Sequence, residues 1–175
     1  VDQQENYKRS GFDFAYNNIR YGGVPKPLEV TGGPEIRRIG EPDAELLAFD
    51  AAVFPVPRTA FLTAWLGTEK HAAFASYDGG TLTGYAVARP CVSGTKIGPL
   101  FASDAGTARA LAAECVRAAG PGDIFLDVPE PNAAAVALAK ELGLAPVFET
   151  ARMYRGPAPQ IDLDRIFGVT SFELG

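Results

Sequence analysis

The distribution of apolar and polar positions predicts a pair of adjacent strands near the middle of the chain. Two apolar runs, residues 72–77 and 82–88, are separated only by Asp78, Gly79 and Gly80. These three residues can adopt the positive φ angles that a tight turn between antiparallel strands requires. We therefore expect a β-hairpin over residues 72–88.

Other segments have the spacing of helices that bury one face. These helices are predicted over residues 42–55, 57–67, 105–119 and 132–143. Pro55 ends the first, and Gly67 ends the second. Asn132 is a typical helix N-cap, and Gly143 is a typical residue at which a helix stops.

Short apolar runs between these helices predict the remaining strands. They lie at residues 36–39, 95–102, 123–128, 146–154 and 166–174. The order from residue 35 is strand, two helices, hairpin, strand, helix, strand, helix, strand and a final strand. This order predicts an α/β (α+β) fold, with a mixed central sheet flanked by helices.

The first 34 residues have a different pattern. Aromatic and polar residues alternate from Phe12 onward, which predicts a strand over residues 12–21 with one buried face. Glycine and proline are dense between Gly22 and Pro34, as in a linker. We expect a segment of residues 1–23, a linker of residues 24–34 and a main domain of residues 35–175.

Composition and charge narrow the function classes. The 175 residues include 47% hydrophobic and 21% charged residues and have a formal net charge of −5. This charge, without a basic cluster interleaved with aromatic residues, argues against nucleic-acid binding. There is no apolar run long enough for a transmembrane helix and no secretory signal, so we expect a cytoplasmic protein without a membrane partner. Because the chain begins at Val1, we expect a fragment or a processed product.

Few residues offer thiol or metal chemistry. Cys91 and Cys115 are the two cysteines, and His71 is the single histidine. No group of His and Cys has the spacing of a zinc site, so no metal is expected. Cys91 could act as a nucleophile, but no histidine is near it in sequence, and a structural thiol is the simpler interpretation.

The order of elements from residue 35 onward resembles that of the GCN5-related N-acetyltransferase (GNAT) superfamily. The segment Asn132-x-x-Ala135-x-x-Leu138-x-x-x-Leu142-Gly143-Leu144 is similar to the family's last helix and its glycine stop. Tyr7-x-x-x-Gly11-Phe12 matches the end of the same motif a second time, before the linker. The resemblance implies residues 1–23 as the C-terminal remnant of an upstream GNAT domain, and residues 35–175 as a second, degenerate copy like those of bacterial tandem members.

The resemblance also implies where acetyl-CoA binds in a functional copy. The family's phosphate loop lies between the fourth strand and its helix, where free backbone amides hold an anion. The aligned stretch is Ser103-Asp-Ala-Gly106-Thr-Ala108, which keeps a glycine and a small residue. Ser103 replaces a long polar side chain, and Asp104 adds a negative charge. A polar turn with Ser103 or Asp104 as helix cap explains the same residues, so acetyl-CoA binding by this domain is in doubt.

Two further residues have a role implied by the resemblance and an ordinary alternative. A tyrosine four residues before the helix-ending glycine protonates the leaving thiolate in many members. Tyr7 has this place in the first copy, and Ala139 has it in the second. Tyr7 could instead be an aromatic packing residue. Asn132 lies where members often contact the cofactor, but it also fits the role of N-cap.

Candidate residues for the acceptor lie at the ends of strands. We expect a cleft at strand ends to bring together five polar side chains, although solvated positions would have the same pattern. These candidates are Asp127, Glu130, Glu149, Arg152 and Tyr154.

The leading hypothesis is acetyl transfer from acetyl-CoA to a small-molecule or peptide amine, with this domain shaping the acceptor site or the interface with the upstream domain. The alternative is a binding or dimerisation module that retains only the fold, for which a second copy of the chain is a candidate partner. Ser103, Asp104 and Ala139 favour the alternative. The sequence does not fix the acceptor, because one fold supports many activities.

Overall fold

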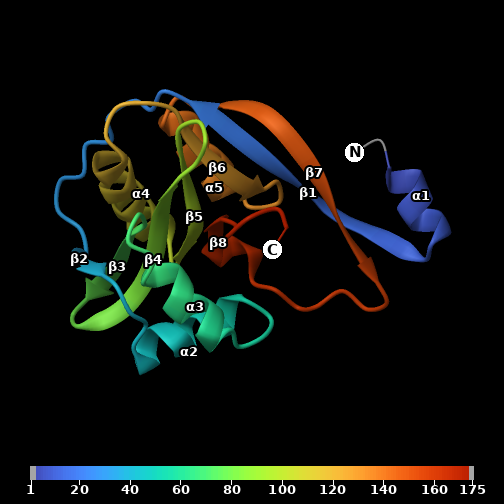
Figure 1. The fold of residues 1–175 in the computed structure, drawn as a ribbon, viewed down its shortest axis with the longest axis horizontal. Helices are drawn as coiled ribbons and strands as arrows, with labels where there is room; N and C mark the ends of the chain where they lie inside the picture. Colours follow the sequence, from blue (N-terminus) through green and yellow to red (C-terminus); the bar gives the residue numbers. More distant parts are fainter. Residues whose placement is uncertain (1–2, 174–175) are drawn as a thin grey trace.

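One mixed sheet runs through the molecule. The structure is a computed structural model that describes residues 3–173. The strands are, in spatial order, β2 (Glu35–Ile39), β3 (Ala72–Asp78), β4 (Thr81–Pro90), β5 (Thr95–Ala102), β6 (Ile124–Pro129), β1 (Phe12–Gly23) and β7 (Ala145–Arg155). A short strand, β8 (Ile166–Gly168), pairs with β5 beside this path. The expected α/β fold with a mixed sheet is confirmed (Figure 1).

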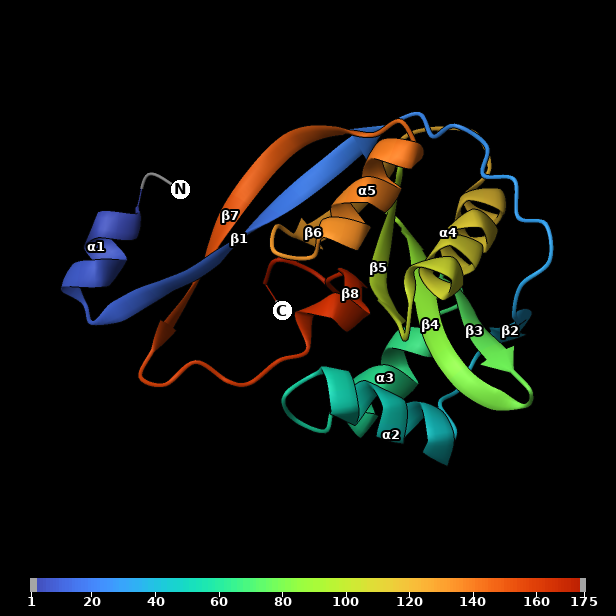
Figure 2. The ribbon, with the colours of Figure 1, turned by 180° about the vertical axis from the view of Figure 1, so that it is seen from behind.

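Helices cover both faces of the sheet. They are α1 (Gln4–Arg9), α2 (Ala44–Val53), α3 (Thr59–Leu66), α4 (Ala105–Ala119) and α5 (Ala133–Glu141). The pairs α4/α5 and α2/α3 pack in separate apolar cores. Consecutive residues of β4 alternate between these cores, with Ala86 beside α4/α5 and Tyr85 beside α2/α3. Helix α1 lies apart, at the far end of the β1–β7 ribbon (Figures 1 and 2).

Local sequence signals predicted several elements well. The hairpin turns at Gly79 and Gly80, which have φ angles of 56° and 85°. The side chain of Asp104 accepts a hydrogen bond from the Thr107 amide and caps α4, and Asn132 caps α5 in the same way through Ala135. In each case a short-range rule of backbone geometry fixes the element, so the expectation from sequence is confirmed.

Strand β1 is inserted between β6 and β7. It pairs antiparallel with both, so residues 12–23 lie in the same sheet as residues 35–173. The residues after β1 form no regular element before β2, as expected of a linker, but they are held to the body of the domain. The Lys26 amide donates to the Leu142 carbonyl at 2.8 Å, and Arg109 donates to the Glu29 carbonyl at 2.5 Å. The linker thus separates two segments of sequence that share one sheet.

The C-terminal segment differs from its prediction. Instead of a strand over residues 166–174, a 3-10 turn, η1 (Leu163–Arg165), leads into the three-residue strand β8, and residue 174 lies outside the described residues. Strand pairing ends early because the next polar groups bond elsewhere. The Val169 amide donates to the Asp127 carbonyl of β6, and Thr170 accepts from Arg58.

Candidate functional site

The start of α4 is the place where the sequence predicted a phosphate loop. The Asp104 carboxylate accepts hydrogen bonds from the Thr107 amide and the Thr107 hydroxyl, both at 2.9 Å. The Ser103 hydroxyl donates to the same carboxylate at 3.2 Å. The bond from the Thr107 amide is the main reason that the pKa of Asp104 lies below its usual value. An anion of the chain itself therefore occupies the end of this helix.

The other residues aligned with the phosphate loop do not add a binding group. Ala108 is fully buried in the core. A Cβ at Gly106 would meet only the Asp104 carboxylate, at 3.1 Å. The adjoining hollow has a volume of about 440 Å³, and its lining includes the carboxylates of Asp78 and Asp104 but no lysine or arginine. Negative charge without a cation disfavours a diphosphate here.

Strand β8 closes the crevice at the carboxyl ends of β5 and β6, which is where ligands usually bind in open α/β sheets. These parallel strands pair only over residues 95–97 and 124–126. Beyond that point β8 pairs with β5, with Gly168 opposite Leu100. The fit is tight, because a Cβ at Gly168 would lie 2.7 Å from the Leu126 side chain. The chain's own C-terminal segment thus fills the crevice.

Asn132 holds this segment in place. Its side-chain amide donates to the carbonyls of Leu163 at 2.9 Å, Asp164 at 3.2 Å and Ile166 at 3.0 Å. Its oxygen caps α5 at the same time. Asn132 is 1% exposed, so the structure places it as a buried clamp between α5 and the segment before β8. All of its donors and its acceptor are used within the chain.

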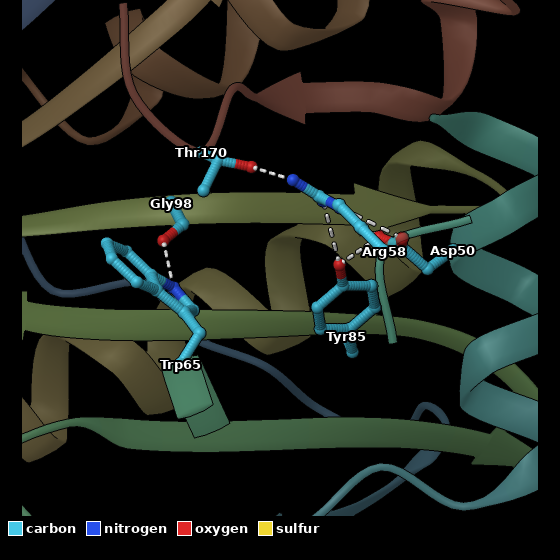
Figure 3. A network of polar contacts seen from close by, with 6 residues as sticks. All are labelled: Asp50, Arg58, Trp65, Tyr85, Gly98 and Thr170. Atoms are coloured by element: carbon cyan, nitrogen blue, oxygen red, sulfur yellow. Dashed lines mark hydrogen bonds and ion pairs between the residues drawn. The ribbon is translucent and has the colours of Figure 1, made fainter. Parts of the chain in front are cut away.

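A buried polar network that sequence analysis missed braces the same segment from the other side (Figure 3). Arg58, before α3, forms two bonds to the Asp50 carboxylate at 2.8 and 2.9 Å and donates to the Thr170 hydroxyl at 2.9 Å. The Tyr85 hydroxyl donates to Asp50. The guanidinium lies over the rings of Phe54 and Phe61. An arginine between two phenylalanines was the available sequence signal.

Three features of residues 35–173 bear on whether this domain can bind acetyl-CoA. The Thr107 amide at the start of α4 is bonded to the Asp104 carboxylate, the hollow beside it has no lysine or arginine in its lining, and β8 fills the crevice between β5 and β6. The residues present therefore do not fit the cofactor. Ala139, at the place where the resemblance implies the tyrosine that protonates the thiolate, is fully buried and leaves no room for a tyrosine. This also argues against acetyl transfer in this domain.

The acidic candidates for the acceptor do not come together. Asp127 is 0% exposed and is bonded by Arg20, at 2.6 and 2.9 Å, and by Lys96. Burial lowers the pKa of Lys96, and Asp127 opposes this effect. Glu130 and Glu149 are exposed, and Glu130 accepts a hydrogen bond from Asn17 at 3.1 Å. Asp127 is therefore an interior ion pair, and the two glutamates lie at the surface.

Arg152 and Tyr154 do come together, with Tyr16 of β1 as a partner that sequence analysis did not single out. Tyr16 lies opposite Arg152 in the ladder, and its hydroxyl interacts with the side chains of Arg152 and Tyr154. Burial raises the pKa of Tyr16 to about 12, helped by Tyr154 and opposed by Arg152. The three side chains border a cavity of about 100 Å³. Its other walls are mainly apolar and come from α2, β5 and the C-terminal segment: Val53, Phe54, Pro55, Phe101, Pro159, Ile161, Ile166 and Val169.

Tyr7 lies in the last part of α1 and is 52% exposed. Its ring meets that of Phe12 edge-on, with centroids 5.5 Å apart. It also borders a hollow of about 270 Å³ that reaches Arg152 and Asn18. Asn18 is 2% exposed, and its side-chain oxygen has no hydrogen-bond partner within residues 3–173. Tyr7 and Arg152 thus share one open hollow.

The remaining candidates are placed apart from these cavities. His71 Nδ1 lies 2.7 Å from the Trp65 carbonyl, and Cys91 is exposed while Cys115 is buried. Across residues 3–173, no three His, Cys, Asp or Glu side chains are grouped as a metal site would need. No helix in that range has the length and apolar character needed to cross a bilayer.

Comparison with known proteins finds relatives of one kind. The model of an acetyltransferase (GNAT) domain matches residues 46–168. A holothin acyltransferase from a Pseudoalteromonas species is 28% identical over 176 residues, covering 99% of this chain and 60% of that protein. The chain therefore spans about 60% of the length of this relative.

Solved structures share the fold. A structure from Pyrococcus horikoshii, assigned as an acetyltransferase, superposes with a TM-score of 0.84 at 20% identity, covering 100% of this chain and 57% of the other. A GCN5-related N-acetyltransferase from Kribbella flavida gives a TM-score of 0.59 at 21% identity, covering 85% of this chain and 40% of the other. In both comparisons, much of the longer protein has no counterpart here.

Proposed function

Since this chain belongs to the GNAT acetyltransferases, we propose that it is the half of an acyltransferase that does not bind the cofactor, in a longer enzyme that transfers an acetyl group from acetyl-CoA to an amine. The observation that carries the proposal is that the Asp104 carboxylate lies at the start of α4 and is bonded by the Thr107 amide. Strand β8, in the crevice between β5 and β6, supports it independently. Chemistry then takes place in an upstream copy, to which Tyr7 belongs by its sequence motif.

The contribution of this half is an acceptor pocket. The cavity beside Tyr16, Arg152 and Tyr154 combines apolar walls with a cation and two hydroxyl groups. Such a site suits a small acceptor that has an apolar body and a hydrogen-bond acceptor or negative charge at one end. The hollow beside Tyr7 also reaches Arg152, so an acceptor held by Arg152 would lie near the candidate acid of the upstream copy.

A second candidate function is a binding module without a catalytic role. It is favoured by Ala139, which is buried where the family's acid would stand, and by the structural use of Asn132. The two candidates differ in what Arg152 does. In the first, Arg152 contacts the acceptor, and in the second no acceptor binds to this half.

Calorimetry and kinetics test the proposal together. Titrating acetyl-CoA into the 175-residue chain should give no saturable heat, and stoichiometric binding would contradict the proposed division of roles. In the longer enzyme, Tyr154→Phe and Arg152→Ala should raise the KM for the amine by about tenfold or more, with the KM for acetyl-CoA unchanged. Arg38→Ala, on the distant strand β2, is the matched control. If neither substitution changes the KM for the amine, the result would favour the binding module.

A further inference from the structure

The repeat in the sequence has a counterpart in the structure of the helix ends and strands beside it. Gly143 follows Gly11 by 132 positions (143 minus 11), and both have left-handed φ angles, 75° and 83°. The same spacing relates the last residues of α1 and α5, which are Arg9 and Glu141. It also relates β1 to β7, because both strands begin just after these glycines and end 132 positions apart, at residues 23 and 155.

These two equivalent strands pair with each other about a local two-fold axis. In the antiparallel ladder Asn18 lies opposite Thr150, and these residues are themselves 132 positions apart. On either side, Arg20 lies opposite Phe148, and Arg152 lies opposite Tyr16. The repeat spacing exchanges these two pairs, since it relates Arg20 to Arg152 and Tyr16 to Phe148. An arginine beside an aromatic ring thus occurs on both sides of the axis.

The two outer edges of the β1–β7 ribbon differ in their strand pairing. The outer edge of β1 is paired with β6, where Arg20 lies opposite Asp127 and bonds both oxygens of its carboxylate. The outer edge of β7 has no neighbouring strand within residues 3–173. Arg152, the counterpart of Arg20, forms no ion pair with any carboxylate in that range, although it interacts with the Tyr16 hydroxyl.

The free edge of β7 also has the character of an interface. None of its eleven residues is buried, and Val147 and Phe148 are 56% and 57% exposed. A strand edge without a neighbour can pair with a strand of another unit, because its backbone amides and carbonyls on that side are free. In Figure 1 the β1–β7 ribbon extends away from α2, α3 and α4, and α1 lies at its far end.

We propose that the outer edge of β7 binds a strand equivalent to β6 from a second unit of this fold, and that this strand places a carboxylate on Nε and Nη2 of Arg152, as Asp127 does on Arg20. The Nη1 group of Arg152 then stays available for the acceptor. The occupant is the upstream copy in the longer protein, so the inference rests on the proposed function. The two-fold relation then makes one continuous sheet through both units, with β1 and β7 at its centre and an Arg–carboxylate pair on each side of the axis.

Hydrogen exchange of the β7 backbone tests the pairing directly. Amides of residues 150–155 that do not bond β1 should exchange at least about tenfold more slowly in the longer protein than in the 175-residue chain. Arg152→Glu should remove this protection by opposing the carboxylate, whereas Arg152→Lys should retain most of it. Lys140→Glu, an exposed charge reversal on α5, should have no effect on β7 exchange.

The outcomes separate the interface from the activity. Equal exchange in the two forms would overturn the pairing, even if the longer protein acetylates amines. Protection that Arg152→Glu removes would support the pairing, even if no acetyl transfer is found. If the 175-residue chain instead forms a dimer in solution that protects residues 150–155, the occupant is a second copy of this chain, and the proposal is wrong.

Discussion

Arg58 illustrates how a single residue sets the arrangement around the cavity beside Tyr16, Arg152 and Tyr154. It is enclosed by aromatic rings and joins Asp50 of α2 to Thr170, just beyond β8. Asp50 is 1% exposed, so its charge depends on this one cation and on the Tyr85 hydroxyl. Two segments far apart in sequence are held together by one side chain, and Phe54 of the pocket wall is stacked on it.

We predict that Arg58→Ala lowers the free energy of unfolding by about 3–5 kcal/mol, because it leaves the Asp50 carboxylate buried and without its ion-pair partner. Urea denaturation followed by circular dichroism measures the change. Arg38→Ala on β2, where the side chain is exposed, should change stability by less than about 0.5 kcal/mol. A loss for Arg58→Ala no larger than that of the control would show that the network contributes little.

At the scale of elements, the sequence predicted the structures that depend on neighbouring residues. It did not predict those that depend on contacts with residues far away in the sequence. The hairpin at Gly79 and Gly80 and the caps at Asp104 and Asn132 depend on a few neighbouring residues. Strand β8 depends on β5, β6 and Arg58, which periodicity does not reveal. The sequence therefore predicted a longer strand there than the structure has.

The candidate site follows the same division. Arg152 and Tyr154 were expected on one face of a strand, and they do border one cavity. Tyr16 was missed because it joins them only through the pairing of β1 with β7. Asp127 has the pattern of a residue at a strand end, but the cations that enclose it, Arg20 and Lys96, come from two other strands.

Asn132 offers a test at the element scale, because one side chain caps α5 and also binds the segment before β8. We predict that Asn132→Ala is more destabilising than Asp104→Ala, which removes only a cap worth about 1 kcal/mol. The difference arises because Asn132→Ala also removes the donor to the buried Ile166 carbonyl and its neighbours, at about 1–3 kcal/mol.

Asn132→Asp separates the two roles of this side chain. Aspartate can cap α5, but it has no amide with which to bind the three carbonyls. Thermal unfolding of the three variants should therefore rank Asn132→Asp below the wild type. Wild-type stability for Asn132→Asp would mean that the cap alone matters and that β8 is held by its strand pairing.

For the molecule as a whole, the repeat could be read from the sequence, but its spatial consequence could not. The glycine- and proline-rich linker suggested a boundary between residues 1–23 and the main domain. In the structure β1 lies inside the sheet, contributes the buried Tyr21 to the core, and supplies Arg20 to Asp127. The glycine and proline content predicts where the backbone lacks regular structure. It does not predict which strands pair in one sheet, because that depends on contacts between distant parts of the sequence.

A shortened chain that begins at Val24 tests whether residues 35–175 fold without strand β1. Without β1, both β6 and β7 lose a neighbour, and Asp127 keeps Lys96 as its only cation within residues 24–173. We predict that this shortened chain has no cooperative thermal transition, and that a synthetic peptide of residues 12–23 restores one when added in trans. The same peptide with Arg20→Ala should restore less, because a buried carboxylate is costly without its full set of partners. Cooperative unfolding of the shortened chain at the wild-type temperature would instead make residues 35–175 an independent domain, to which β1 is only appended.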